Sequence, residues 1–144
     1  MKHIKFILIA AITMVLFACS KSDINEEPET ILSDISGVWS EYAYLCSDGY
    51  FVDISDTGYN MYYEFARPDA FTKYQIKDGE KEILTQGKWT YNPGTRTAEI
   101  KEPRGWDLTI KFDFAMLNGS YIATMKIKGR TPTSNSTIKA RLIR

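Results

Sequence analysis

The sequence predicts an all-β domain that folds as an antiparallel, up-and-down β-barrel of eight strands. Apolar and polar residues alternate with a period of two in short segments from residue 37 onward, which is typical of half-buried strands. Turn signals such as Asn118-Gly119 separate these segments. No segment shows a helical apolar stripe long enough to connect parallel strands. Sequential hairpins form a meander, and closure into a barrel removes its unpaired edges.

A leader and a tether are expected before the barrel. An apolar run at residues 6–18 follows two lysines; it is too short to span a membrane and is typical of a secretory signal peptide, predicted here as residues 1–18. Residues 19–34 are mostly acidic and polar and cannot form a core, so they are expected to be a flexible tether. The barrel domain is expected at residues 35–144.

The end of the predicted signal peptide, Leu16-Phe17-Ala18-Cys19, resembles the lipobox of bacterial lipoproteins. The resemblance implies that Cys19 becomes the first residue of the mature protein and carries a lipid anchor, which holds a protein stably on a membrane when it has two or more acyl chains. The protein would then sit on the outer membrane, on its periplasmic face or at the cell surface. The acidic stretch after Cys19 resembles the surface-export signal of Bacteroidetes lipoproteins, although a solvated spacer explains it equally well. An ordinary signal peptide with an incidental cysteine is the alternative for the whole leader.

The clearest predicted strand covers residues 106–114, where Trp106, Leu108 and Phe112 share the inner face. In the segment 83–92, Ile83 and Trp89 are expected on the inner face by the same alternation. The full set of expected strands is 37–46, 59–66, 70–77, 83–92, 95–102, 106–114, 121–128 and 136–143.

Two short motifs resemble lipocalins. Gly37-Val38-Trp39, at the start of the first predicted strand, resembles the Gly-x-Trp opening of that family, and Gly87-Lys88-Trp89 resembles lipocalin-like domains of Bacteroidetes lipoproteins. The resemblance covers about residues 35–144. It implies that Gly37 and Trp39 form a motif that closes one end of the barrel beneath a basic residue of the last strand, for which Arg141 is the candidate. The alternation of the last segment points Arg141 outward, so Trp39 as an ordinary core residue is the alternative.

The composition argues against catalysis and metal binding. The only histidine, His3, lies in the predicted signal peptide, so the mature chain would lack a Ser-His-Asp triad and the usual zinc ligands. Asp48, Asp53 and Asp56 lack the spacing of a calcium-binding loop. We therefore expect no enzymatic activity, no cofactor and no metal. Removal of the leader leaves 16 basic and 18 acidic residues, so no basic excess favours nucleic acid.

The tyrosines give the only indication of a binding site. A tyrosine ring has a flat apolar face and a polar tip, which suits ligand pockets, although tyrosine is also a good strand former. Tyr42, Tyr44, Tyr62 and Tyr74 fall opposite, or ambiguously to, the apolar face of their strands and are the candidate ligand contacts.

Two functions are compatible with these features. The first is a membrane-anchored lipoprotein whose lipocalin-like barrel binds a small apolar or aromatic ligand. Because many large side chains point inward, that ligand would be small or would bind at the rim. The alternative is a non-catalytic interaction module, an accessory subunit or inhibitor, that docks on another cell-envelope protein.

Overall fold

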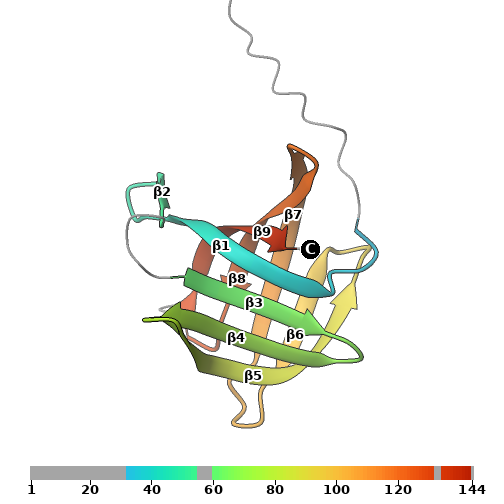
Figure 1. Cartoon of the computed structure of the whole chain (residues 1–144). Coiled ribbons are helices and arrows are strands. Elements are labelled where there is room, and N and C mark those ends of the chain that lie inside the picture. The colour runs from blue at the N-terminus through green and yellow to red at the C-terminus, as the bar shows by residue number, and fades with distance from the viewer. Residues whose placement is uncertain (1–31, 55–59, 132–133, 144) are drawn as a thin grey trace, which may run out of the picture.

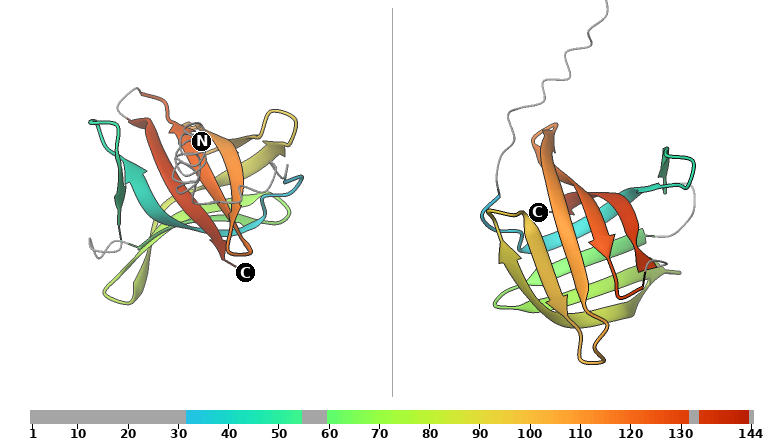
Figure 2. Two further views of the ribbon diagram at one scale, coloured as in Figure 1. Left: turned by 90° about the horizontal axis from the view of Figure 1, so that it is seen from above. Right: turned by 180° about the vertical axis from the view of Figure 1, so that it is seen from behind.

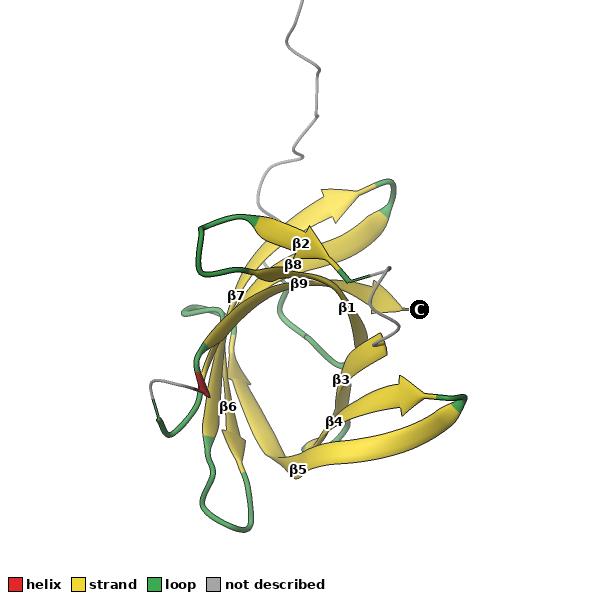
Figure 3. Ribbon diagram, turned by 90° about the vertical axis from the view of Figure 1, so that its left-hand side faces the viewer, coloured by secondary structure: helices red, strands yellow, loops and turns green. Residues whose placement is uncertain are grey.

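The computed structural model describes residues 32–54, 60–131 and 134–143, which form a closed antiparallel barrel of eight strands with one additional strand (Figure 1). The predicted fold is confirmed. Each strand from β3 to β8 pairs with the next one in the sequence. β1 pairs with β3 on one side and with β9 on the other, which closes the ring (Figure 3). The short additional strand, β2, pairs with β1 beside the ring. The strands are β1 (Gly37–Leu45), β2 (Phe51–Asp53), β3 (Asn60–Ala66), β4 (Ala70–Lys77), β5 (Glu80–Asn92), β6 (Thr97–Lys101), β7 (Leu108–Leu117), β8 (Ser120–Lys128) and β9 (Ser136–Ile143).

The barrel has two walls of different inclination. Figure 2 shows, from behind, the wall formed by β6 to β9, whose strands run steeply across the direction of β3 to β5 in the opposite wall. The hairpin between β7 and β8 turns at Asn118 and Gly119, whose φ angles of 51° and 74° are both positive. Two positive φ angles are what a two-residue turn of type I′ requires, so the predicted hairpin at this position is confirmed.

An apolar core fills the end of the barrel where β1 begins. Trp39 is fully buried there, with its ring centroid 6.1 Å from those of both Phe112 and Phe114. Further aromatic side chains of this core are Phe65, Phe71, Trp89 and Tyr91. Such a dense set of rings leaves no room for a ligand between them.

The segment just before β1 covers this end of the barrel. Ile35 is fully buried, and its carbonyl oxygen accepts a hydrogen bond of 3.0 Å from the indole nitrogen of Trp39. The carbonyl oxygen of Leu32 accepts one of 3.0 Å from the hydroxyl of Tyr91, and the Leu32 side chain packs against the core. Asp34 forms an ion pair with Arg67. We call this end, defined by Leu32, Ile35 and Trp39, the closed end.

One predicted side-chain direction in β5 is wrong. Ile83 is 52% exposed and pairs with Tyr74, whereas Thr85 pairs with Lys73, so Leu84 is an extra residue in β5. A bulge of this kind moves the residues on one side of it to the other face of the sheet. Ile83 therefore lies on the outer face, while Trp89, beyond the bulge, is buried as predicted.

The predicted signal peptide at 1–18, Cys19 and most of the predicted tether lie outside the described residues. Among the residues that are described, no helix is long and apolar enough to cross a membrane.

Candidate functional site

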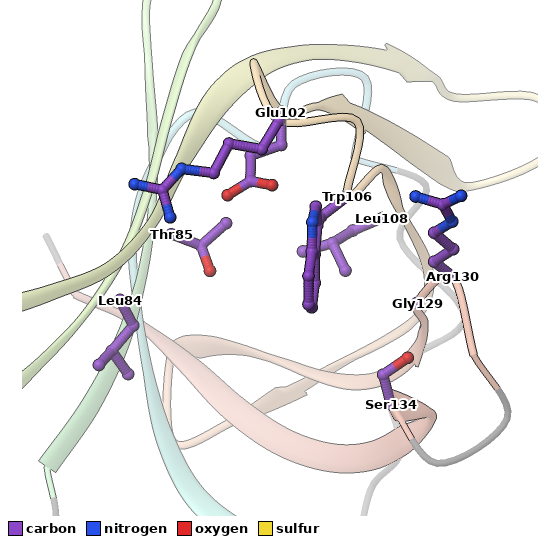
Figure 4. A pocket seen from close by; sticks show the side chains of 9 residues that line it. Leu84, Thr85, Glu102, Trp106, Leu108, Gly129, Arg130 and Ser134 are labelled. Carbon is purple, nitrogen blue, oxygen red and sulfur yellow. The ribbon is translucent and has the colours of Figure 1, made fainter.

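The barrel carries an open pocket of about 360 Å³ at the end opposite the closed end. It lies between the β5 wall, the turn from β6 to β7 and the segment after β8 (Figure 4). We call it the mouth pocket; its principal lining residues are Leu84, Thr85, Glu102, Trp106, Leu108 and Arg130. Its volume lies within the range of pockets that hold small molecules.

The most prominent wall of the mouth pocket is Trp106, which was predicted to be an inward-facing residue of the strand 106–114. This prediction is wrong, because β7 begins only at Leu108 and Trp106 is 64% exposed. The turn before β7 is held by Asp107, whose carboxylate accepts hydrogen bonds from Lys101 Nζ at 2.9 Å and from the backbone N–H of Glu102 at 3.2 Å. The bond from Lys101 lowers the pKa of the Asp107 carboxyl below its usual value. Trp106 thus sits in a fixed turn, and its indole stands in the pocket instead of the core.

Glu102 is the second distinctive residue of the mouth pocket. It follows β6 with the spacing of the inward-facing Ala98 and Ile100, and Figure 4 shows its carboxylate directed into the pocket between Thr85 and Trp106. Its Oε2 atom is buried and has no hydrogen-bond partner among the described residues. Buried carboxylate oxygens without a donor are rare, because loss of hydration costs free energy that a hydrogen bond normally offsets.

Positive charge flanks the pocket. Arg104 and Arg130 both contribute to its lining and are exposed. Within the described part of the chain, neither guanidinium group is in an ion pair. Both groups are therefore available as hydrogen-bond donors to a bound molecule.

A polar cluster inside the barrel lies next to the pocket. Tyr63 is 2% exposed, and its hydroxyl donates a hydrogen bond of 3.1 Å to Oε2 of Glu41. The ammonium of Lys73 lies 5.3 Å from the centroid of the Tyr63 ring, and Lys73 pairs in register with Thr85 of the mouth pocket. Burial raises the pKa of the Glu41 carboxyl and lowers the pKa of Lys73. The interior is thus apolar at the closed end and partly polar toward the mouth.

Sequence reasoning missed this cluster and the role of Glu102. The signal that could have found them is spacing: Glu41 lies two residues after Trp39, and Lys73 two residues after Phe71, so each continues the inner face of its strand. Glu102 continues the inner face of β6 in the same way.

The four candidate tyrosines do not converge on one site. Tyr62 and Tyr74 stack on the outer face of β3 and β4, with ring centroids 5.0 Å apart. Tyr42 lies beneath the guanidinium of Arg141, 5.7 Å from the ring centroid. Tyr44 is partly exposed and pairs with Ile138 toward the mouth end of β1. Among the described residues that line the mouth pocket, none is one of these four tyrosines. Their role in binding stays a prediction.

Gly37 and Trp39 lie at the closed end, and their role as a closing motif stays a prediction. A Cβ atom on Gly37 would lie 2.8 Å from Cδ1 of Leu142, and its φ of +131° disfavours other residues, so this position requires glycine. Arg141 is exposed, as the alternation predicts, and its guanidinium lies over Tyr42 instead of Trp39. Trp39 is held by Ile35 and by its aromatic neighbours.

Among the described residues, no group of three or more His, Cys, Asp or Glu side chains is placed to hold a metal ion. Comparisons of the chain with protein-family models, with curated proteins and with solved structures found no match.

Proposed function

We propose that this protein is a membrane-anchored lipoprotein whose barrel binds a small molecule with an apolar or aromatic ring in the mouth pocket, without catalysis. The observation that carries the proposal is Trp106, a large aromatic side chain that a fixed turn keeps 64% exposed in the wall of a pocket of ligand size. Leu84 and Leu108 add apolar surface around it. An aromatic ring that stacks on the indole would cover this surface.

The filled core at the closed end supports binding at the mouth. Phe112 and Trp39 occupy the space that a deep ligand would need. The pocket is open, so the ligand of this proposal keeps part of its surface in solvent.

Native mass spectrometry of the full chain, after incubation with a lipid and metabolite extract of its host, tests the binding proposal. We expect an adduct of defined mass that the variant Trp106→Ala loses. The matched control is Trp89→Phe, which changes a buried tryptophan and should keep the adduct. The absence of any adduct on the wild type, or an adduct that the Trp106→Ala variant still forms, would overturn the proposal.

The anchor is tested separately, because binding does not depend on it. The lipobox-like residues 16–19 support attachment to the outer membrane through Cys19. Cells grown with an alkyne-tagged fatty acid should label the wild-type protein and leave Cys19→Ser unlabelled. Label on Cys19→Ser, or no label on the wild type, would rule out lipidation at this residue.

A specific observation also favours the second candidate, docking on another cell-envelope protein. Tyr62, Tyr74 and Ile83 pair in register across three neighbouring strands on the outer face, which places two stacked rings beside an exposed isoleucine. Exposed apolar groups of this kind suit a protein interface. A photo-crosslinker at Ile83 that captures one discrete partner on intact cells would support this function, and an absence of crosslinks would remove it.

A further inference from the structure

We propose that the ligand of the mouth pocket is a neutral ring that carries a hydroxyl group, with the ring stacked on Trp106 and the hydroxyl donating a hydrogen bond to Glu102. This inference rests on the proposed function and specifies its ligand. It makes Glu102 the residue that selects among rings of similar size.

The first argument is the unpaired oxygen of Glu102. Two donors of the turn bind Asp107, whose carboxylate accepts hydrogen bonds from Lys101 Nζ and from the backbone N–H of Glu102. Oε2 of Glu102 is left buried without a donor from the described residues. Glu102 lines the pocket, so a molecule there that brings its own donor would offer this carboxylate a hydrogen bond that the described residues do not supply to Oε2.

The second argument is the position of this oxygen relative to the indole. Figure 4 shows the Glu102 carboxylate directed into the space between Thr85 and Trp106. A second space of about 240 Å³ shares Trp106 and Arg130 with the mouth pocket. A flat ring against the indole would therefore lie in the same pocket as the Glu102 carboxylate.

The third argument concerns charge. Arg104 and Arg130 contribute to the lining and make no ion pair with the described residues, so an ammonium ligand would meet two positive charges. A carboxylate ligand would meet the negative charge of Glu102. A neutral hydroxyl avoids both conflicts, since it donates to Glu102 and can accept a bond from a guanidinium.

Phenols and sugars share this chemistry, and matched probes separate them. The experiment follows the indole N–H signals of the full chain by NMR, with the Trp106 signal assigned from Trp106→Phe. The probes are p-cresol, its methyl ether 4-methylanisole, which lacks the donor, and methyl α-glucoside. We expect p-cresol to shift the Trp106 signal with an affinity about tenfold or more above that of 4-methylanisole, since a hydrogen bond to a charged group contributes about 1.5–3 kcal/mol. A response to methyl α-glucoside, with none to p-cresol, would support the requirement for a hydroxyl group on the ligand and would identify its ring as that of a sugar.

The variant Glu102→Met tests the residue itself. It removes the acceptor at similar length and should erase the preference for the hydroxyl probe, while Glu99→Met, on the exposed face of β6 just before Glu102, should keep it. Unchanged signals of the buried Trp39 and Trp89 check that each variant is folded. Equal binding of p-cresol and 4-methylanisole to the wild type would overturn the role of Glu102 and leave an aromatic pocket in place. A Trp106 signal that no probe moves would overturn the pocket itself.

Discussion

Replacement of Phe112 by alanine should be among the most damaging changes in the barrel. The Phe112 side chain is fully buried, and its ring centroid lies 5.4–6.1 Å from those of Trp39, Phe65, Tyr91 and Phe114. A buried phenylalanine typically loses 3–5 kcal/mol on truncation to alanine. Aromatic pairs add about 0.5–1.5 kcal/mol beyond area burial. Four such neighbours place Phe112→Ala near the upper end, at about 4–5 kcal/mol.

That loss is a large part of the 5–15 kcal/mol by which ordinary domains are stable, and it corresponds to a fall in Tm of roughly 15–20 °C. Urea unfolding of the full chain, followed by far-UV circular dichroism, measures it directly. Trp106→Ala is the matched control: it removes a larger side chain, but one that is 64% exposed, and should cost less than about 1 kcal/mol. Equal losses in the two variants would refute the division into a packed closed end and an open mouth.

Three further changes test other parts of the structure. Gly87→Ala should lower the free energy of unfolding by about 1–3 kcal/mol, because its Cβ would lie 2.6 Å from the carbonyl oxygen of Lys101; an unchanged urea midpoint would contradict this close approach. The double variant Glu41→Gln/Lys73→Met should be more stable by about 1 kcal/mol at pH 7, because it removes two partly desolvated charges and leaves Tyr63 an amide oxygen as acceptor; a lower urea midpoint would show that the charges stabilise the fold. Asp34→Asn should be less stable than the wild type at pH 7 by no more than about 1 kcal/mol, since the ion pair with Arg67 is exposed. Hydrogen bonds from Ser36 and Arg67 lower the pKa of Asp34, so its contribution is present above the unfolded pKa and is lost as the pH falls through the folded pKa; thermal melts from pH 7 to pH 2 should show the difference disappear at the acid end.

The period-two alternation was sufficient to predict the barrel because one face of each strand is buried. Residues 108–114 show this directly, since Ile110, Phe112 and Phe114 are buried while Thr109, Lys111 and Asp113 are exposed. The hairpin at Asn118-Gly119 followed from local backbone chemistry in the same way.

The candidate site could not be predicted, because at its edges the alternation in the sequence does not match the direction of the side chains in the fold. Trp106 is in phase with Leu108, yet the side chain of Asp107 holds a turn that excludes it from β7. Ile83 is in phase with Trp89, yet the extra residue Leu84 reverses its direction. Both effects arise from contacts between neighbouring strands, which periodicity within one segment does not report. The inward direction of Glu102 could have been inferred from its spacing, but the missing donor to its Oε2 atom among the described residues is evident only in the folded arrangement.

The hydrogen bonds of Leu32 and Ile35 to Tyr91 and Trp39 also give the molecule a direction. They fix the point where the upstream chain joins the barrel to the side away from Trp106. If lipid on Cys19 holds the protein, the anchored chain joins the barrel at the tightly packed end, and the pocket lies at the other end. A molecule bound against Trp106 would then lie away from Leu32 and Ile35, so occupancy of the pocket would not disturb the contacts through which the upstream chain joins the barrel.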